Sequence, residues 1–450
     1  MIADPQHRPP ARRPACPLVL AILAILAVPG CSRPASQTPV TITFPGSAVG
    51  AEAQILRRQL ATFMVEHPGI RVVQRRTPDA ADQRHQLYVQ WLNAGAGDPD
   101  ILQLDVIWTP EFAAAGWILP LDRFSPDTAA FFAATIAANR WRDTLYAVPW
   151  FVDVGMLYWR TDLMPAAPAT LAGLERIARA GVRSGRTRYG LVWQGARYEG
   201  LITTFVEYLA AYGGRILDGG RVVVNSPAGL AALAAMRDEI YRDSIVPPGV
   251  LTWHEEETRF AFQNGEAAFM RNWPYAYSLM QDTAGSKVAG SFAVAPMPAG
   301  PGGAPSAALG GSQLAINRNC EFPDSAWQVI AWLTAPSRML ERAEAVGQFP
   351  ARQAVYDDPR LVRALAIPPA DARAIIAHAV PRPVTPVYTQ LSGILQIQIH
   401  RALTRQTEPR AALDAAAREM QALLDRVGLG GEAGTAGTAG TTKDGQGRPG

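Results

Sequence analysis

Three acidic residues, Asp105, Asp153 and Glu255, each lie within three positions of a tryptophan. Two carboxylates at a suitable separation can hydrolyse a glycoside, one as the acid and the other as the nucleophile or base. The same groups can instead accept hydrogen bonds from sugar hydroxyls and leave the sugar unchanged. Because a sequence does not give the distance between side chains, a secreted glycosidase and a carbohydrate-binding protein both stay open at this point.

The sequence also lacks the motifs that mark several other kinds of catalytic site. The chain has no G-x-S-x-G elbow, no H-E-x-x-H zinc motif, no Walker loop and no G-x-G-x-x-G after a strand. Its six histidines do not occur at metal-ligand spacing, which argues against a zinc site. The glycine-rich residues 93–100 lead into a predicted strand, so they lack the helix N-terminus that holds a phosphate. We therefore expect no metal and no other cofactor.

The composition limits the class of protein. Of 450 residues, 48% are apolar and 18% are charged, which allows two or three domains with sizeable cores. Lysine and arginine total 42 against 39 aspartate and glutamate, so the net charge is +3. This near-neutral charge argues against nucleic acid as a partner, because nucleic-acid binding needs a concentrated basic face.

The first 31 residues are typical of a secretory signal. Three arginines precede an 11-residue apolar run at 18–28, which is too short for a permanent membrane-spanning helix. Residues 28–31 (VPGC) resemble the bacterial lipoprotein box, although Pro29 replaces the usual small residue. This resemblance implies that Cys31 is lipidated and that residues 32–39 form a tether. An ordinary signal peptide is the alternative.

The body of the chain begins with the pattern of a doubly wound α/β fold. Strand and helix patterns alternate at 40–44, 51–66, 70–73, 82–92 and 100–106. Short connections of this kind predict a mostly parallel sheet covered by helices. Asp105 ends the third strand, and such sheets bind ligands at the carboxyl ends of their strands.

A second α/β region is predicted from residue 146 onward. Its helices are expected near 169–180, 199–212, 227–242 and 256–264, and its strands at 292–298 and 309–316. Helices near 323–335 and 410–426 close the fold. Residues 428–450 are of low complexity and have almost nothing to bury, so we expect them to be disordered.

Aromatic side chains meet the second requirement of a sugar site, because the apolar C–H face of a pyranose packs on an aromatic ring. Trp273 is the preferred candidate, since Asn272 and Pro274 on either side predict an exposed turn rather than a buried strand. The other candidates are Trp108, Trp150, Phe151, Tyr158, Trp159, Trp253, Tyr275 and Tyr388.

A series of segments carries a more specific signal through its order and spacing. The segments are AGAGDPDILQLD (94–105), WTPEFAAAGW (108–117), LYAVPW (145–150), FAFQNGEAAFM (260–270), NWP (272–274), LGGS (309–312) and RPVTPVY (382–388). Together they resemble the extracellular solute-binding proteins of ABC sugar importers, in the maltose/trehalose-type branch, over about residues 38–427. Within that family, LDVIWTPEFAAAGW and RPVTPVY are most similar to the mycobacterial trehalose-binding lipoprotein.

The resemblance implies a type II-like periplasmic-binding-protein fold, with two α/β lobes joined by hinge segments around a central ligand cleft. One lobe would contain residues 40–150 plus about 310–350, and the other 151–309 plus about 351–427. The chain would cross between the lobes near 150–155, 305–312 and 350–380.

It also implies which acidic side chains contact the sugar. Asp105 would accept hydrogen bonds from hydroxyls. Asp153 occupies a position where close relatives have asparagine, a change that keeps an acceptor but removes a donor. Glu255 would be the third acidic contact, with Glu256 and Glu257 as the alternatives next to it.

Five further residues complete the implied site. Trp273 would stack on a sugar ring, with Asn272 beside it. Gly310 and Gly311 would let the backbone approach the ligand closely. Arg382 would donate to ring or hydroxyl oxygens and clamp the cleft, or it would form a structural ion pair.

The function implied is capture of a di- or oligosaccharide of the trehalose/maltose class for import, without chemistry, by a lipid-anchored monomer outside the cytoplasm. Its partners would be two ABC permease subunits in the membrane and a cytoplasmic ATPase. A secreted glycoside hydrolase, or a binding protein for glycerol phosphate or another small solute, is the alternative. Phosphate cargo should bring extra cations to the cleft motifs, and only Arg271 and Arg382 occur there.

Overall fold

The computed structural model describes residues 39–46, 50–78, 81–301 and 305–430. The predicted signal sequence with Cys31, and the low-complexity tail from residue 431 onward, lie outside these ranges. Among the described helices, none is both long and apolar enough to cross a bilayer. Within the same ranges, no group of three or more His, Cys, Asp or Glu side chains could hold a metal ion.

The predicted order of the first five elements is confirmed. β1 (Val40–Gly46) pairs in parallel with β2 (Ile70–Arg76), and α1 (Gly50–Glu66) connects them. α2 (Ala81–Asn93) then leads to β3 (Ile101–Asp105). Phe44 of β1 and Phe63 of α1 are fully buried in one core cluster. Burial of each such side chain contributes roughly 1.5–3 kcal/mol to stability.

The four-stranded sheet of this first lobe has the order β14–β6–β13–β3. β13 (Leu309–Ile316) lies between β3 and β6 (Val148–Val154) and is antiparallel to both, and β14 (Phe349–Pro350) is antiparallel to β6. The prediction of a mostly parallel sheet is therefore wrong for these four strands. β13 and β14 come from late in the chain and run in the opposite direction, a pairing that the local sequence around β3 does not reveal.

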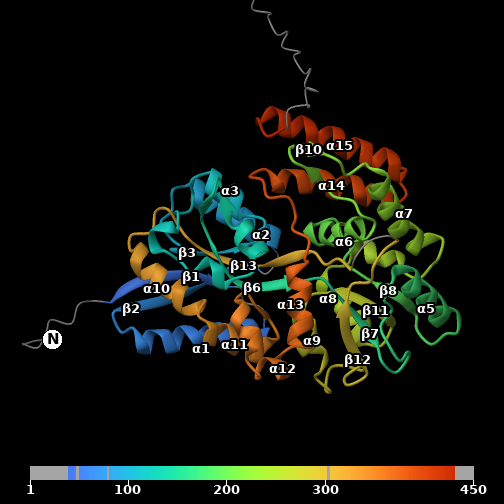
Figure 1. The fold of residues 1–450 in the computed structure, drawn as a ribbon, viewed down its shortest axis with the longest axis horizontal. Helices are drawn as coiled ribbons and strands as arrows, with labels where there is room; N and C mark the ends of the chain where they lie inside the picture. The colour runs from blue at the N-terminus through green and yellow to red at the C-terminus, as the bar shows by residue number, and fades with distance from the viewer. Residues whose placement is uncertain (1–38, 47–49, 79–80, 302–304, 431–450) are drawn as a thin grey trace, which may run out of the picture. The chain divides into compact units, whose positions relative to one another are not determined.

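Helices complete the first lobe around this sheet. The short helices α3 (Thr109–Ala114) and α4 (Ala133–Ala138) follow β3 in the chain. α10 (Pro323–Leu333) packs on β13, and α11 (Pro336–Val346) packs on α1 and β14 (Figure 1).

The second lobe is built on a sheet with the order β12–β7–β11–β8. β7 (Met156–Arg160) is antiparallel to β11 (Ala267–Asn272) and β12 (Phe292–Pro296), whereas β11 is parallel to β8 (Tyr189–Val192). Its helices are α5 (Leu171–Arg183), α6 (Glu199–Ala211), α7 (Pro227–Tyr241), α8 (Glu255–Gln263) and α9 (Tyr275–Met280). Every residue of α6 from 200 to 209 is buried, so this helix runs through the core of the lobe.

The C-terminal part of the chain is divided between the lobes. α14 (Tyr388–Leu403) and α15 (Pro409–Arg426) pack on α6 or α7 of the second lobe. The preceding elements η4 (Gln353–Asp357), α12 (Leu361–Ala364) and α13 (Pro369–Ala377) pack instead against α11, β14 or β6. Residues 353–377 thus contact elements of the first lobe in a stretch that the predicted division assigned to the second lobe.

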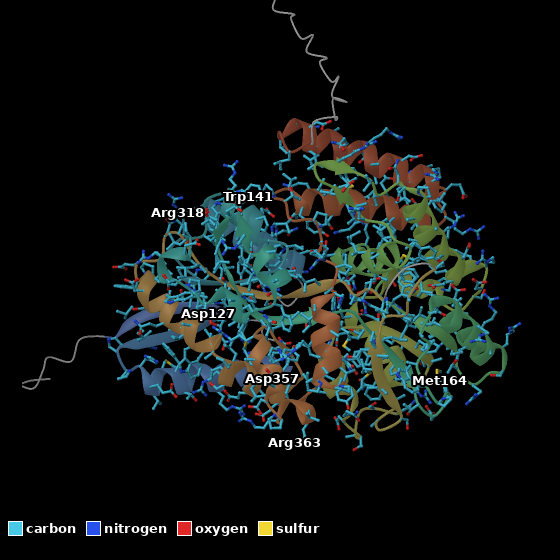
Figure 2. The ribbon with its side chains drawn as sticks, viewed as in Figure 1. Asp127, Trp141, Met164, Arg318, Asp357 and Arg363 are labelled. Atoms are coloured by element: carbon cyan, nitrogen blue, oxygen red, sulfur yellow. The ribbon has the colours of Figure 1, made fainter. Side chains whose placement is uncertain are left out.

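Three segments connect the lobes. Gly155 separates β6 from β7, a second segment leads from β12 to β13, and residues 378–387 lead from α13 to α14. The third crossing thus begins about where the predicted range of 350–380 ends. Away from these crossings, charged side chains such as Asp357 and Arg363 lie exposed at the surface (Figure 2).

Candidate ligand-binding site

The register of the first-lobe sheet brings three of the predicted site residues together. Asp105 is the last residue of β3 and lies opposite Ser312 of β13. Two positions earlier in β13, Gly310 lies opposite Asp153, close to the end of β6. The carboxyl ends of β3 and β6 therefore meet on either side of β13, where an α/β sheet is expected to bind its ligand.

Gly310 and Gly311 allow other groups to approach their backbone closely, and in this structure those groups belong to the protein itself. A Cβ atom on Gly311 would lie 2.3 Å from the carbonyl oxygen of Phe151, and the positive φ of 116° at this residue also favours glycine. A Cβ atom on Gly310 would lie 3.4 Å from both Asp153 Cβ and Trp273 Cζ3. Gly310 therefore lets the indole of Trp273, from the second lobe, lie against the first-lobe strands.

Trp273 is held by the residues around it. Its indole Nε1 donates to Glu255 Oε1 at 3.4 Å, and its backbone N–H donates to Asn272 Oδ1 at 2.9 Å. Asn272 Nδ2 donates to the backbone carbonyl of Glu255 at 3.2 Å. The indole itself is half-buried at the junction between β11 and α9.

The predicted exposed turn around Trp273 is only partly correct. Asn272 is the last residue of β11 and is fully buried, so its amide positions Trp273 and does not reach solvent in this structure. The local sequence could not reveal this, because the strand is covered by elements that are distant along the chain.

The three consecutive glutamates have different partners. Glu255 lies next to the Trp273 indole. Glu256 accepts hydrogen bonds from Arg259 and Tyr275, and Glu257 accepts one from the backbone N–H of His254. The structure thus places Glu255, rather than its two neighbours, beside the Trp273 indole.

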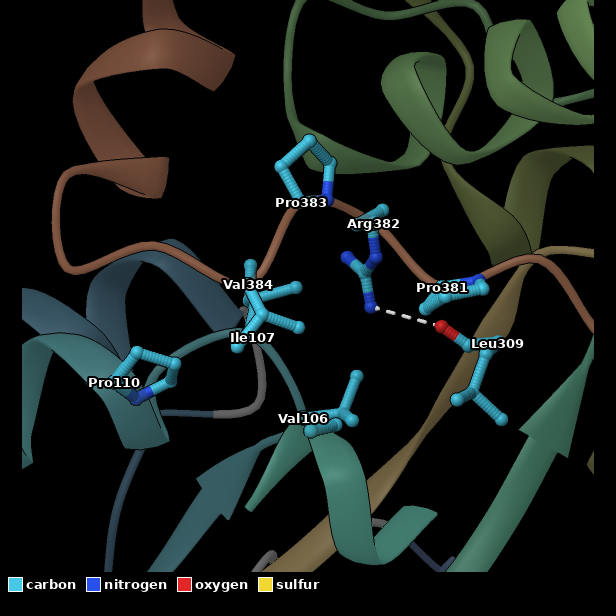
Figure 3. A pocket seen from close by; sticks show the side chains of 9 residues that line it. Val106, Ile107, Pro110, Leu309, Pro381, Arg382, Pro383 and Val384 are labelled. Carbon is cyan, nitrogen blue, oxygen red and sulfur yellow. Dashed lines mark hydrogen bonds between the residues drawn. The ribbon is translucent and has the colours of Figure 1, made fainter. Parts of the chain in front are cut away.

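Arg382 lies at the centre of an ion-pair network. Its Nη1 donates to Glu199 Oε1 at 2.7 Å, and its Nη2 donates to Asp105 Oδ1 at 3.3 Å. Nη2 also donates to the carbonyl of Leu309 at 3.3 Å (Figure 3). Burial alone would lower the pKa of Arg382, but the Asp105 and Glu199 carboxylates outweigh it and raise the pKa. The predicted alternative of a structural ion pair describes this arrangement, which links β3, β13 and α6.

Sequence reasoning did not single out Glu199 or Tyr198. Glu199 accepts hydrogen bonds from Arg382, Tyr388 and Ser392, and Tyr198 faces Glu255. Burial, followed by the charge of Glu255, raises the pKa of Tyr198. An acidic residue in the first turn of a helix is common for reasons of helix stability, so Glu199 gave no distinct signal.

Asp153 is the site carboxylate with the most unusual electrostatics. Burial, followed by the charges of Glu52 and Asp105, raises its pKa from 3.8 to about 7, although Arg271 and Arg342 act in the opposite direction. Near neutral pH this group is therefore divided between a proton-donating and a proton-accepting form.

The pKa of Asp153 leads to a prediction for sugar binding. Hydroxyls that donate to the ionised carboxylate would lower its pKa, so affinity should rise from about pH 6 to about pH 8 by up to about tenfold. Asp153→Asn should remove this rise, because the amide does not titrate. Isothermal titration calorimetry of both proteins in this pH range checks it. A wild-type affinity that does not change with pH would contradict the prediction.

The two arginines of the predicted site motifs are not free cations. Arg271 forms a buried ion pair with Glu207, and Arg382 is paired with Asp105 and Glu199. Burial, then the charges of Asp105 and Glu255 among others, raises the pKa of Asp82 on α2. This arrangement suits a neutral ligand with hydroxyl donors and disfavours an anionic one.

Of two cavities lined by described residues, one lies beside this cluster and the other away from it. The space next to Arg382 has a volume of about 10 Å³, enough for about one water molecule. It is lined by Val106, Ile107, Pro110, Ala138, Leu309 and residues 381–384 (Figure 3). A larger cavity of about 340 Å³ lies near Pro296, Ile375 and His378, and none of its described lining residues is a predicted site residue. Its mostly apolar lining contains no carboxylate and does not suit a sugar.

The fold and this cluster define the class of protein. Two α/β lobes are joined by three crossings, and aromatic and acidic side chains gather where the crossings meet, as in a two-lobed solute-binding protein. Residues 48–339 match the family described as bacterial extracellular solute-binding protein, and the chain belongs to this family.

Individual relatives agree with this assignment. A probable ABC transporter-binding protein of Deinococcus radiodurans is 34% identical over 407 residues, which are 87% of this chain and 95% of the relative. The structure of maltose-bound MalE3 of T. maritima is 41% identical, with a TM-score of 0.80, and the match covers 86% of this chain and 100% of that one. A solute-binding protein of Thermotoga lettingae TMO bound with α-D-tagatose is 25% identical, with a TM-score of 0.76 and coverage of 86% and 100%.

Proposed function

We propose that this protein is the substrate-binding lipoprotein of an ABC importer and captures a neutral di- or oligosaccharide of the maltose/trehalose class without altering it. The observation that carries the proposal is the position of Trp273, which lies half-buried next to Gly310, the strand partner of Asp153, with Glu255 at its indole nitrogen. An aromatic plane bordered by carboxylates matches the apolar face and hydroxyl rim of a pyranose. The maltose found in a relative that is 41% identical supports this ligand class.

Isothermal titration calorimetry with maltose, trehalose, tagatose and glycerophosphocholine tests the proposal. At least one of the two disaccharides should bind with a Kd in the micromolar range or tighter, or about −8 kcal/mol. If only tagatose or only glycerophosphocholine bound, the proposed ligand class would be wrong. If none of the four compounds bound, the proposal would be rejected.

A glycosidase that uses two of the carboxylates is the second candidate. Asp105 is ion-paired with Arg382, and Glu255 is hydrogen-bonded to Trp273, so neither is set apart as a free acid or nucleophile in this structure. The family, the Deinococcus radiodurans relative and the Thermotoga lettingae structure are described as binding proteins. Incubation with maltose and trehalose should release no glucose, and release at about 1 per second or faster would favour the enzyme.

A phosphate-bearing solute is less well supported. Both arginines of the cleft motifs already have buried or partly buried carboxylate partners. Binding of a phosphate group would have to break one of these pairs, which would leave a carboxylate unpaired.

We also infer that Cys31 carries a lipid that anchors the mature protein as a monomer on the outer face of a cell membrane, beside the permease subunits. Acyl chains supply stable anchoring only in combination, as in a lipidated N-terminal cysteine. In the native host, wild-type protein should sediment with membranes, whereas Cys31→Ser should shift most of it to the soluble or uncleaved precursor fraction. An unchanged membrane fraction of mature Cys31→Ser protein would contradict the anchor.

A further inference from the structure

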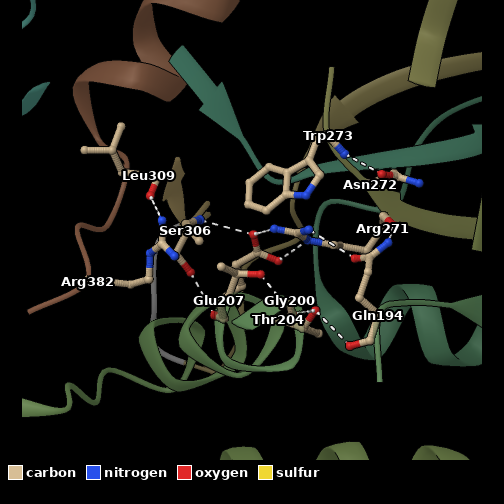
Figure 4. Close-up of polar contacts among 12 residues, drawn as sticks. Gln194, Gly200, Thr204, Glu207, Arg271, Asn272, Trp273, Ser306, Leu309 and Arg382 are labelled. Carbon is tan, nitrogen blue, oxygen red and sulfur yellow. Dashed lines mark hydrogen bonds and ion pairs between the residues drawn. The ribbon is translucent and has the colours of Figure 1, made fainter. Parts of the chain in front are cut away.

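Glu207 is a charged residue inside the buried helix α6. Its side chain and that of Arg271 are each only 1% exposed. A carboxylate at such depth is strongly destabilising unless it is paired and hydrogen-bonded. Arg271 supplies two hydrogen bonds, from Nε at 2.8 Å and from Nη2 at 2.6 Å, and the backbone N–H of Ala308 supplies a third at 3.1 Å (Figure 4).

The Arg271 guanidinium lies directly beneath the Trp273 indole. Its central carbon is 3.9 Å from the centre of the indole ring. Gln194 holds the guanidinium from the other side, because its Oε1 accepts from Arg271 Nη1 at 3.1 Å and its Nε2 donates to the Arg271 carbonyl at 3.1 Å. The orientation of the platform ring therefore depends on a guanidinium that Glu207 and Gln194 fix in place (Figure 4).

The same ion pair contacts two of the three crossings between the lobes. At the first crossing, a Cβ atom on Gly155 would lie 1.7 Å from Glu207 Oε1 and 2.7 Å from Arg271 Nη2, so the pair packs on the glycine backbone. At the second crossing, Ala308 donates to the Glu207 carboxylate, and Ser306 Oγ donates to the Glu207 backbone carbonyl at 3.1 Å. Glu207 thus joins the aromatic platform to the segments about which the lobes would turn.

We propose that Glu207 is a positioning residue of the binding site: through Arg271 it fixes the Trp273 indole, and through Gly155 and Ala308 it couples that indole to the crossings. The effect on sugar affinity rests on the proposed function, whereas the placement of the indole does not. The two parts therefore need separate measurements.

The first measurement uses no ligand. In a spectrum of ¹⁵N-labelled protein, the indole N–H resonance of Trp273 is identified among 11 tryptophans by its loss in Trp273→Phe. Glu207→Gln should shift or broaden this resonance. Glu239→Gln is the control for replacing a buried acidic side chain, because Glu239 lies in the same lobe and accepts from Tyr208 and from the indole of Trp193. That variant should move the Trp193 resonance and leave Trp273 in place.

The second measurement is maltose affinity by calorimetry. Glu207→Gln should weaken binding by about 3- to 30-fold, the range for residues that act on a site without touching its ligand. Glu239→Gln should change it by less than about twofold. Gly155→Ala should resemble Glu207→Gln, because the added methyl group displaces the carboxylate from the same place.

A double variant keeps the test decisive if Glu207→Gln folds poorly. Glu207→Gln/Arg271→Met removes both buried charges, so it should recover folding while the Trp273 resonance stays displaced. If that resonance keeps its wild-type position in the folded Glu207 variants, or maltose affinity is unchanged in them, the proposal is overturned. If wild-type protein binds no sugar, the proposed function fails, and the resonance alone decides the role of Glu207.

Discussion

Trp273→Ala should weaken maltose binding by about 5- to 150-fold, or about 1–3 kcal/mol, without unfolding the protein. The Arg271 guanidinium lies over one face of the half-buried indole and the Cζ3 edge lies near Gly310, so we place the apolar face of the sugar on the opposite face of the ring. Loss of the ring removes that stacking surface and also leaves the Arg271 guanidinium without its aromatic neighbour. Calorimetry with maltose, together with a thermal unfolding scan, measures both effects.

Two further variants distinguish the loss of a stacking surface from a general loss of stability. Trp273→Phe keeps an aromatic plane and should retain most of the affinity. Trp327→Ala removes a half-buried tryptophan that stacks on Phe124 in the first lobe, so it should lower stability without changing affinity. If Trp273→Ala is folded and binds maltose as wild type does, another aromatic residue must form the platform.

Arg382→Met should lower the free energy of unfolding by about 3–5 kcal/mol, the usual range when one partner of a buried ion pair is removed. The Arg382 side chain is 2% exposed, and Glu199 and Asp105 both depend on it. Without the guanidinium, the hydroxyl donors of Tyr388 and Ser392 remain to Glu199 among the described side chains. Urea unfolding of both proteins, with equal slopes as a check, measures the loss.

The pH dependence of that loss identifies its cause. Burial already raises the pKa of Glu199 in the folded protein, and removal of Arg382 should raise it further. When the pKa of a carboxyl group is higher in the folded protein than in the unfolded chain, the unfolded chain ionises first as pH rises. The free energy of unfolding therefore falls between the unfolded-state pKa and the folded-state pKa. The stability deficit of Arg382→Met should therefore be smaller at about pH 5 than at about pH 8.

A surface ion pair serves as the control for Arg382. Arg360 pairs with Asp358, and its side chain is 54% exposed. Arg360→Met should lower the free energy of unfolding far less than Arg382→Met does, because solvent screens an exposed pair. A loss in Arg382→Met no larger than that in Arg360→Met would show that the network around Arg382 does not hold the crossings together.

Much of the local structure could be predicted from the sequence. The alternation of strand and helix patterns identified β1 to β3 with α1 and α2, and the apolar periodicity located α6, α7 and α15. The chain also displays which side chains are available for a sugar, because Asp105, Asp153, Glu255 and Trp273 stand next to other aromatic residues or in turns. Such signals depend only on neighbours in the chain.

The pairing of strands that are distant along the chain could not be predicted from these local signals. β13 returns from the second lobe and lies antiparallel between β3 and β6, where a mostly parallel sheet was predicted. Asn272 was predicted in an exposed turn and is buried, because neighbouring strands and α8 cover β11.

The sequence by itself therefore determined the elements, the family resemblance and the kinds of side chain available for a neutral sugar. Only the tertiary structure decided which of these side chains are already paired with other groups of the protein and which remain available to a sugar. Arg271 pairs with a carboxylate 64 residues away, and Arg382 with carboxylates 183 and 277 residues away. Whether a charge is free or neutralised depends on groups brought within about 4 Å by packing, and spacing along the chain does not encode that distance.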